Sequence, residues 1–350
     1  MSTPREVLEL DGAHGEGGGQ LVRTAVALAA ITGTPIRIRN VRARRDKPGL
    51  APQHLAAVRA VAALCDARCE HLALRSTAFE FVPGALRAGQ FAVDVGTAGS
   101  VTLVLQALLP AMICAPAPCR VQVTGGTDVR AAPPLDYFRE VLIPLLARMG
   151  IAIECTVRRR GYYPRGGGEV EVAVMPARPA PIALDQPGGL RSVEGHAHAG
   201  NLPGHIPQRM REAAERALKG ATAPIRVKTS VVGETEAVGQ GGAIVLWAEL
   251  ANTVLGAGCV AERGVRAETL GESAGAALAA DLAAGATLDV HAADQVLIYL
   301  ALAGGESSFA AREVSLHAAT AMWLIGQFLP VKFEIARERG RARVRVSARA

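Results

Sequence analysis

An internal repeat is the sequence feature that most restricts how this chain can fold. In three segments an apolar helical pattern is followed by an alternating strand, a turn and a second strand. These segments span residues 48–84, 132–174 and 315–347. Each follows a further helical pattern that starts from a loop containing glycine or aspartate, at residues 15–33, 96–113 and 291–305. The pattern predicts an α/β fold built of three tandem α+β repeats.

The array of repeats is interrupted between about Arg178 and Ala274. A linker rich in proline and glycine, at residues 176–189, comes before a different pattern. This pattern predicts a strand near Val193, helices over residues 207–218 and 268–282, and strands at residues 225–232 and 243–250. We therefore expect a large domain of residues 1–180 and 277–350, with a small α/β domain of residues 181–276 inserted into it.

Composition and charge favour anionic partners inside the cell. Half of the 350 residues are hydrophobic, but only 4% are aromatic, which suits helices packed closely on sheets. The net charge of +6 and the pI near 9.2 favour nucleotides or nucleic acid, although a composition rich in arginine and alanine alone gives the same bias. The six cysteines form no CxxC pair, no secretory signal is visible, and the uncharged residues 95–119 are broken by polar residues and prolines. We expect a cytoplasmic protein that does not enter a membrane.

A glycine-rich loop, residues 12–23, places five glycines around Glu16 and ends at the start of a helix. Backbone N–H groups in such a loop can approach an anion closely. The loop has neither the GK[ST] ending of a P-loop nor the glycine spacing of a Rossmann fingerprint. A purely structural turn is an equal alternative when the loop is considered alone.

Four cations, Arg42, Arg44, Arg45 and Lys47, stand immediately before Pro48 at the start of another predicted helix. They repel one another, and guanidinium groups match phosphate oxygens, so a polyphosphate or an RNA end would relieve the repulsion. A solvated charged loop is the alternative interpretation.

Several polar residues stand out within apolar helical patterns. Gln106 lies in the apolar residues 96–110, where backbone partners alone could satisfy it. Asp294 lies in the first turn of the helix that begins near residue 291, where it could cap or orient a neighbour. His317 lies near the start of an apolar helix, where a lone histidine is more often a satisfied core residue than a catalytic group.

Seven ordered motifs together resemble the RNA 3'-terminal phosphate cyclase family. They are GAHGEGGGQLVRTA, RARRDKPGLAPQHL, GTAGSVTLVLQALLPA, GGTDVRAAPP, GYYPRGGGEV, AADQ and the SLHAAT helix that ends in FLPVKF, and their order and spacing match from about Leu8 to Val346. The resemblance implies three repeats similar to the C-terminal domain of bacterial translation initiation factor three, with a small domain inserted before the last.

The resemblance implies a function for His317 as the nucleophile that takes AMP from ATP. A neutral imidazole can attack the α-phosphorus and form a reactive phosphoramidate. AMP then passes to an RNA 3'-phosphate, and the adjacent 2'-OH closes the 2',3'-cyclic phosphate and expels AMP. ATP and RNA 3'-phosphate ends are therefore the expected substrates, and a homodimer is left open.

The resemblance also implies further site residues. Glu16 would bind a divalent metal, Mg²⁺ or Mn²⁺. The phosphates or the RNA end would be contacted by Gln20, Arg23, Arg42, Arg45 and Gln53. The nucleotide pocket would include Gln106, Pro133, His291, Asp294 and Gln295. Some relatives carry a tyrosine that stacks on adenine where this chain has His291, so the resemblance implies that this contact is either weaker here or supplied by imidazole.

Two other interpretations compete with the cyclase. One is a cyclase-like protein of ribosome assembly that binds RNA without catalysis, which the presence of His317 and Glu16 disfavours. The other is an enolpyruvyl transferase of related repeat architecture, which the cation cluster disfavours. A metal site at His196 and His198, with His205 nearby, is a minor alternative to an ordinary strand.

Overall fold

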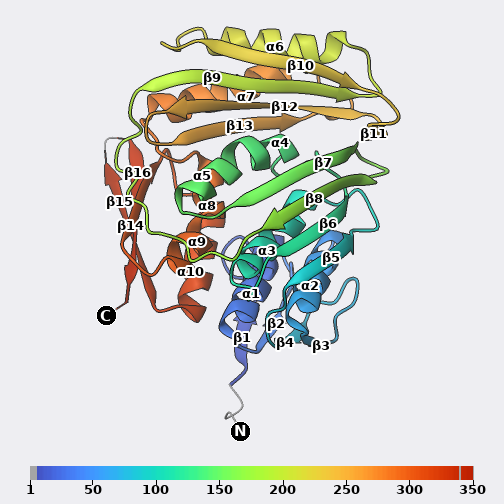
Figure 1. The fold of residues 1–350 in the computed structure, drawn as a ribbon, viewed down its shortest axis with the longest axis vertical. Helices are drawn as coiled ribbons and strands as arrows, with labels where there is room; N and C mark the ends of the chain where they lie inside the picture. Colours follow the sequence, from blue (N-terminus) through green and yellow to red (C-terminus); the bar gives the residue numbers. More distant parts are fainter. Residues whose placement is uncertain (1–5, 339, 350) are drawn as a thin grey trace.

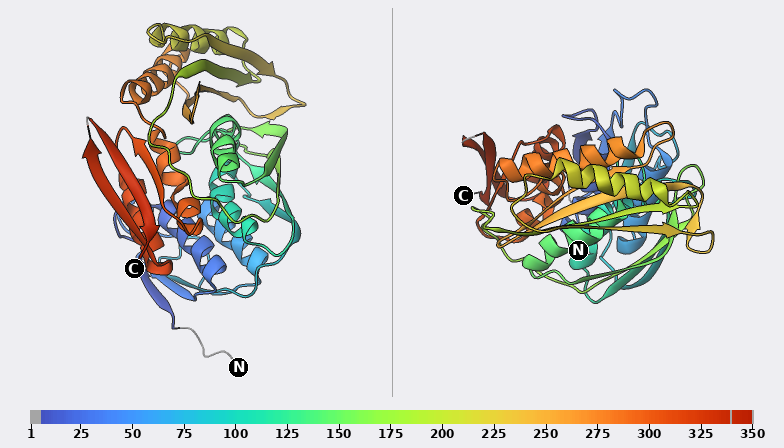
Figure 2. Two further views of the ribbon diagram at one scale, coloured as in Figure 1. Left: turned by 60° about the vertical axis from the view of Figure 1, so that its left-hand side comes forward. Right: turned by 90° about the horizontal axis from the view of Figure 1, so that it is seen from above.

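The computed structural model describes residues 6–338 and 340–349. Residues 1–5, 339 and 350 of the predicted large domain lie outside the described residues. The fold is of mixed α/β class, as the sequence predicts, and the described strands form four sheets (Figure 1). Helices occupy the centre of the lower body, and three of the sheets lie around them on the outside (Figure 2).

The first sheet has the strand order β1-β2-β4-β3, with strands at Leu8–Asp11, Ile36–Arg39, Phe79–Val82 and Arg68–Glu70. β1 and β2 are parallel, so a crossover must join them, and α1 (Gly19–Thr32) makes it. α2 (Pro52–Cys65) connects β2 to the antiparallel pair of β3 and β4. Alternation along β2 and β4 buries Ile36, Ile38, Phe79 and Phe81 against the helices.

The second sheet repeats this order as β5-β6-β8-β7, with β11 added beside β7. These strands lie at Gly89–Asp94, Cys119–Gly125, Gly168–Val174, Ile153–Gly161 and Ala237–Val238. α3 (Val101–Ile113) joins β5 to β6. The single helix expected at residues 132–150 is interrupted: α4 (Leu135–Tyr137) and α5 (Ile143–Arg148) are separated by the π-helical turn η1 (Phe138–Leu142). Pro144 has no N–H to donate at the start of α5, which favours this local widening.

The third sheet has the order β14-β16-β15, with strands at Ser307–Ala311, Arg341–Ala348 and Val331–Glu338. Its helices are α8 (Val290–Gln295), α9 (Leu297–Leu302) and α10 (Leu316–Phe328). A distant segment lies parallel to β14, where Ala183 bridges Ser308 and the Leu184 N–H donates to the Ser308 carbonyl at 2.8 Å. Residues far apart in the chain therefore complete this edge.

The fourth sheet has the order β10-β9-β12-β13, with strands at Ile225–Val232, Leu190–Gly200, Gly241–Leu250 and Val254–Val260. α6 (His205–Ala217) and α7 (Ala267–Ala283) cover one face and enclose a second hydrophobic core (Figure 1, top). The two helices approach closely at Gly271, where a Cβ would lie 2.0 Å from the Met210 carbonyl oxygen. The predicted boundary at residue 276 falls inside α7, and the division into domains stays a prediction.

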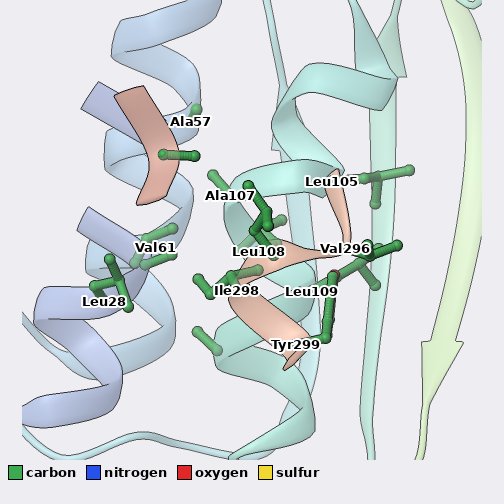
Figure 3. Packing of buried hydrophobic residues seen from close by; sticks show 14 of the residues in the cluster. Leu28, Ala57, Val61, Leu105, Ala107, Leu108, Leu109, Val296, Ile298 and Tyr299 are labelled. Carbon is green, nitrogen blue, oxygen red and sulfur yellow. The ribbon is translucent and has the colours of Figure 1, made fainter. Parts of the chain in front are cut away.

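The main core lies where the helices of different sheets meet. Leu28 of α1, Val61 of α2, Leu108 of α3 and Ile298 of α9 are buried in one cluster (Figure 3). Many of their neighbours are alanines, which let helix axes approach closely and fix the helix ends relative to one another. Within the described residues, no helix combines the length and apolarity needed to cross a membrane.

Candidate active site

A cleft of about 680 Å³ opens between these helices and the fourth sheet. One wall of the cleft is formed by the glycine-rich loop, the starts of α1, α2 and α8, one face of α3 and the first turn of α10. The opposite wall is formed by β13 of the fourth sheet. All twelve residues predicted for the site line this one cleft: Glu16, Gln20, Arg23, Arg42, Arg45, Gln53, Gln106, Pro133, His291, Asp294, Gln295 and His317. The structure thus brings them together, while their individual roles stay predictions.

His317 lies in the first turn of α10, which begins where the Ser315 hydroxyl accepts the Ala318 N–H at 3.0 Å. Its Nδ1 lies 2.8 Å from the Gln20 side-chain oxygen. That oxygen only accepts, so Nδ1 carries the proton and Nε2 keeps an unprotonated lone pair. Burial lowers the pKa of His317, and Arg23 and Arg45 lower it further. The imidazole is therefore neutral at physiological pH.

Glu16 lies opposite His317 in the glycine-rich loop. Its carboxylate forms an ion pair with Arg45, and its Oε2 lies 3.8 Å from Nδ1 of His317. The backbone N–H of Glu16 donates to the Thr320 hydroxyl at 3.0 Å. The loop is thus joined to α10, and the carboxylate is held at the edge of the cleft.

Arg23 is the most deeply buried cation of the cleft, with 7% of its surface exposed. One terminal nitrogen donates to the Gln106 oxygen at 3.4 Å, but the buried Nε has no partner in the described chain. Burial lowers the pKa of Arg23 to about 10, and Asp294 acts in the opposite direction. An unpartnered buried N–H in a cleft is a feature that an anionic ligand would satisfy.

A chain of amide hydrogen bonds fixes the polar residues beside Arg23. Gln106 donates to Gln295 at 2.8 Å, and Gln295 donates to the His291 carbonyl at 3.0 Å. Asp294 is largely buried next to this chain, and burial followed by the charge of Asp289 raises its pKa to about 7. A carboxyl group with such a pKa can either donate or accept a hydrogen bond near neutrality.

Asp289 holds this part of the cleft in place and was not predicted from the sequence. Its Oδ1 accepts from the Tyr137 hydroxyl at 2.7 Å and from two N–H groups at the start of α8, and its Oδ2 accepts from the Gly256 N–H at 2.9 Å. The side chain therefore connects α4, α8 and β13. Only its position before a helix, typical of an N-cap, was visible in the sequence.

His54 also lines the cleft and was not predicted, although it follows Gln53 in a noted motif. Its Nδ1 accepts from the Ala51 N–H at 3.2 Å, so Nε2 carries the proton and lies against Gly19. Burial, with Arg23 and Arg42 nearby, lowers the pKa of His54 to about 3. Other lining residues that were not predicted include Tyr137, Arg130, Cys259 and Glu262. Cys259 lies in β13, and Glu262 lies just after it; this strand was itself not predicted.

The histidines of β9 do not form a metal site. His196 hydrogen bonds to Asp136 at 2.9 Å and to Ser230 at 2.8 Å, and His198 contacts Arg160 at 3.0 Å. No cluster of three or more potential metal-ligating side chains occurs in the part of the chain that the structure describes. These histidines belong instead to a buried polar network between the second and fourth sheets.

Comparison with known proteins gives the family of the chain. The family model for RNA 3'-terminal phosphate cyclase matches residues 14–335. The chain belongs to the RNA 3'-terminal phosphate cyclase family. The predicted resemblance is therefore confirmed, and the match includes every predicted site residue.

Curated members of the cyclase family match the chain almost end to end. An RNA 3'-terminal phosphate cyclase from Nitrosospira multiformis is 54% identical over 96% of each chain. One from Methanopyrus kandleri is 44% identical over 95% of this chain and 96% of its own. A solved enolpyruvyl transferase, NikO from Streptomyces tendae, aligns over 97% of this chain and 48% of its own, with 12% identity and a TM-score of 0.38.

Proposed function

We propose that this protein uses ATP to convert an RNA 3'-terminal phosphate into a 2',3'-cyclic phosphate through a histidine–AMP intermediate. One observation carries the proposal: a neutral His317 presents an unprotonated Nε2 in a cleft whose arginines exceed its nearby carboxylates. Family membership supports the same activity.

The first step is the transfer of AMP to His317. Nε2 attacks the α-phosphorus of ATP, the bond from phosphorus to the bridging oxygen breaks, and pyrophosphate leaves. The imidazole gains positive charge as the N–P bond forms. The Gln20 oxygen at 2.8 Å from Nδ1 and the Glu16 carboxylate at 3.8 Å stabilise that charge.

The second and third steps transfer AMP to RNA and close the ring. An oxygen of the RNA 3'-phosphate attacks the phosphorus of the adduct, the N–P bond breaks, and an RNA(3')pp(5')A anhydride forms. The adjacent 2'-OH then attacks the former terminal phosphate, loses its proton and expels AMP. DNA has no 2'-OH and cannot complete this last step.

The cleft residues divide by chemistry between the two substrates. We assign the phosphates and the RNA end to the cationic and amide side chains of Gln20, Arg23, Arg42, Arg45 and Gln53, because guanidinium forks match phosphate oxygens. The nucleotide pocket is assigned to the residues around α3 and α8: Gln106, Pro133, His291, Asp294 and Gln295. The resemblance implies a tyrosine at this position in some relatives, so we assign the contact with adenine to the imidazole of His291.

Glu16 suits a divalent metal that is bound mainly by substrate. A single carboxylate in a cleft, with phosphate oxygens and water completing the shell, is a donor set that Mg²⁺ or Mn²⁺ accepts. Glu16 would hold the ion, whose contribution is to neutralise phosphate charge during transfer. Arg45, which now pairs with Glu16, would then be free to contact phosphate.

We also propose the three-repeat architecture, each repeat resembling the C-terminal domain of translation initiation factor three, with a small inserted domain. The matching orders β1-β2-β4-β3 and β5-β6-β8-β7 support it. The pairing of Ala183 with Ser308 favours a start of the insertion a few residues after residue 181. The cytoplasmic location and a homodimer stay predictions.

The deciding experiment incubates the protein with α-³²P-labelled ATP and Mg²⁺ and measures acid-labile label on the denatured chain. We expect label on the wild type and on the exposed control His205→Ala, and none on His317→Ala. RNA with a 3'-phosphate should then yield a 2',3'-cyclic end, and the matching DNA should not. Absence of label under varied metals would favour the non-catalytic RNA-binding alternative, and equal label on His317→Ala would exclude this nucleophile.

A further inference from the structure

The glycine-rich loop is held from outside by α10. The His14 ring stacks on the indole of Trp323, with ring centroids 3.6 Å apart and an angle of 16° between planes. The Thr320 hydroxyl accepts the Glu16 N–H at 3.0 Å and donates to the Leu316 carbonyl at 2.7 Å. Thr320 and Trp323 therefore both contact the loop segment that carries Glu16.

Gly15, between these two contacts, fits only because it is glycine. Its φ is +58°, and a Cβ at this position would lie 2.2 Å from the Thr320 hydroxyl oxygen. The hydroxyl thus fills the space that a side chain at residue 15 would need. Close packing of this kind allows the loop little freedom relative to α10.

The loop needs such support because its own sequence supplies little. Five of its eight residues between positions 12 and 19 are glycines, which have the largest conformational entropy to lose. The α1 helix that follows has Gly18 as its N-cap, without a side-chain hydrogen bond. Order in the loop must therefore come from neighbouring elements.

His317, Thr320 and Trp323 are spaced three residues apart on α10, so they lie along adjacent turns of one side of the helix. We propose that Thr320 and Trp323 are positioning residues that fix the distance between the Glu16 carboxylate and the His317 imidazole. One rigid helix then carries both the nucleophile His317 and a clamp, formed by Thr320 and Trp323, that holds the opposing Glu16 carboxylate in place. This inference rests on the proposed adenylation of His317.

The functional test compares adenylation rates of Thr320→Val, Thr320→Ser and the exposed control Thr156→Val. Valine keeps the shape but not the hydrogen bond, so we expect the rate of His317 labelling to fall roughly 10- to 100-fold with a smaller change in the KM for ATP. Serine should restore most of the rate, and Thr156→Val should leave it unchanged. A wild-type rate in Thr320→Val would overturn the proposal.

A second test reports on the clamp without requiring activity. Trp247→Phe leaves Trp323 as the single tryptophan, because the chain contains two. In this background His14→Ala should shift Trp323 emission to the red, as the indole face becomes exposed to water. Hydrogen exchange of residues 13–19 should be faster in Thr320→Val than in the wild type. Unchanged emission and exchange would overturn the clamp even if His317 is adenylated, whereas a failure of adenylation in the wild type would count against the proposed function alone.

Discussion

Two buried charged clusters in this protein are built in opposite ways. Between the second and fourth sheets, Arg160 donates to both oxygens of Asp136 at 2.8 Å and to Asp128 at 3.1 Å, and it contacts His198 at 3.0 Å. Burial opposes the charge on Arg160, but the two carboxylates outweigh it and raise its pKa. Burial likewise opposes ionised Asp136, but the His196 hydrogen bond and Arg160 outweigh it and lower its pKa. Most of the charge in this matched cluster is paired within the protein, although Asp128 Oδ1, 3.7 Å from His198 Nε2, has no hydrogen-bond partner in the described chain.

The cleft cluster has a surplus of positive charge instead. Within the described residues, Arg23 Nε has no partner and Arg42 donates only to backbone carbonyls of its own loop. Burial lowers the pKa of both side chains. Asp294, the carboxylate that acts on Arg23, is itself partly protonated near neutrality. The first network therefore holds two parts of the fold together, while the second presents cations that the described carboxylates do not fully pair, as expected of a site for an anionic ligand.

The largest effect is expected at the matched cluster. Arg160→Met should lower the free energy of unfolding by about 3–5 kcal/mol, because it leaves Asp128 and Asp136 buried without their cation. Urea unfolding followed by circular dichroism at pH 7 measures it. The loss should shrink in the triple variant that also carries Asp128→Asn and Asp136→Asn. A loss below about 1 kcal/mol in Arg160→Met would show that the matched cluster contributes no more to stability than an exposed ion pair.

The contribution of Asp294 to stability should depend on pH in the opposite direction to that of Asp136 in the matched cluster. Its folded pKa of about 7 lies above the unfolded value of 3.8, so its neutral form stabilises the fold fully below pH 3.8, and this stabilisation is lost as pH rises through 7. Asp294→Asn should therefore be more stable than the wild type at pH 8, by up to about 4 kcal/mol, with a smaller difference at pH 5. For Asp136, whose pKa is lowered, stability is instead lost as pH falls below the ordinary range of a carboxyl. Equal stability of Asp294→Asn and the wild type at both pH values would contradict the assignment.

Arg23→Met tests whether the cleft cation serves a ligand rather than the fold. We expect the free energy of unfolding to change by no more than about 1 kcal/mol, because the one side-chain hydrogen bond of the guanidinium within the described chain is long, at 3.4 Å. Affinity for an RNA 3'-phosphate should fall roughly 10- to 100-fold, the loss of one charge-assisted hydrogen bond. Binding titrations and urea unfolding on the same preparation separate the two effects. Destabilisation as large as that of Arg160→Met would show that Arg23, like Arg160, stabilises the fold.

The smallest effect is expected at an exposed pair. Lys332 and Glu334 form an ion pair with side chains 61% and 52% exposed. Lys332→Ala should change the free energy of unfolding by less than about 0.5 kcal/mol, because water and salt screen the pair. A larger change would show that pairing matters here irrespective of burial.

The sequence predicted the elements that have strong local signals. The helices at residues 15–33, 96–113 and 315–330 begin with glycine or a serine cap and continue as long apolar runs, and each is present. β13 was missed because VLGAGCV contains small residues without alternation. The π-helical turn before Pro144 was missed because its register depends on packing rather than on local propensity.

The site was predictable only where several motifs could be considered together. His317 alone looked like a core histidine, and nothing in its helix indicates that Gln20, 297 positions away, fixes its proton. The family resemblance placed both residues in the site, but it assigned Gln20 to the phosphates or the RNA end and not to His317. Asp289 was missed for the same physical reason: its partners Tyr137 and Gly256 come from distant elements, and no local pattern records such contacts.

The pairing of Ala183 with Ser308 has a consequence for biosynthesis. The chain emerges from the ribosome N-terminus first, so the first sheet and strands β5 to β8 of the second sheet are complete in sequence before β9 has been made. The segment at residues 182–184 cannot pair until β14 has been made, because Ser308 lies 125 positions after Ala183. The whole fourth sheet lies between these two segments in the sequence. Closing so long a loop is slow unless the intervening segment is already compact, because unfolded chain carries a large closure entropy. Folding of the fourth sheet therefore shortens the loop that must close before the third sheet can assemble. The cleft needs α10, so it is completed only after the fourth sheet and α10 have been made.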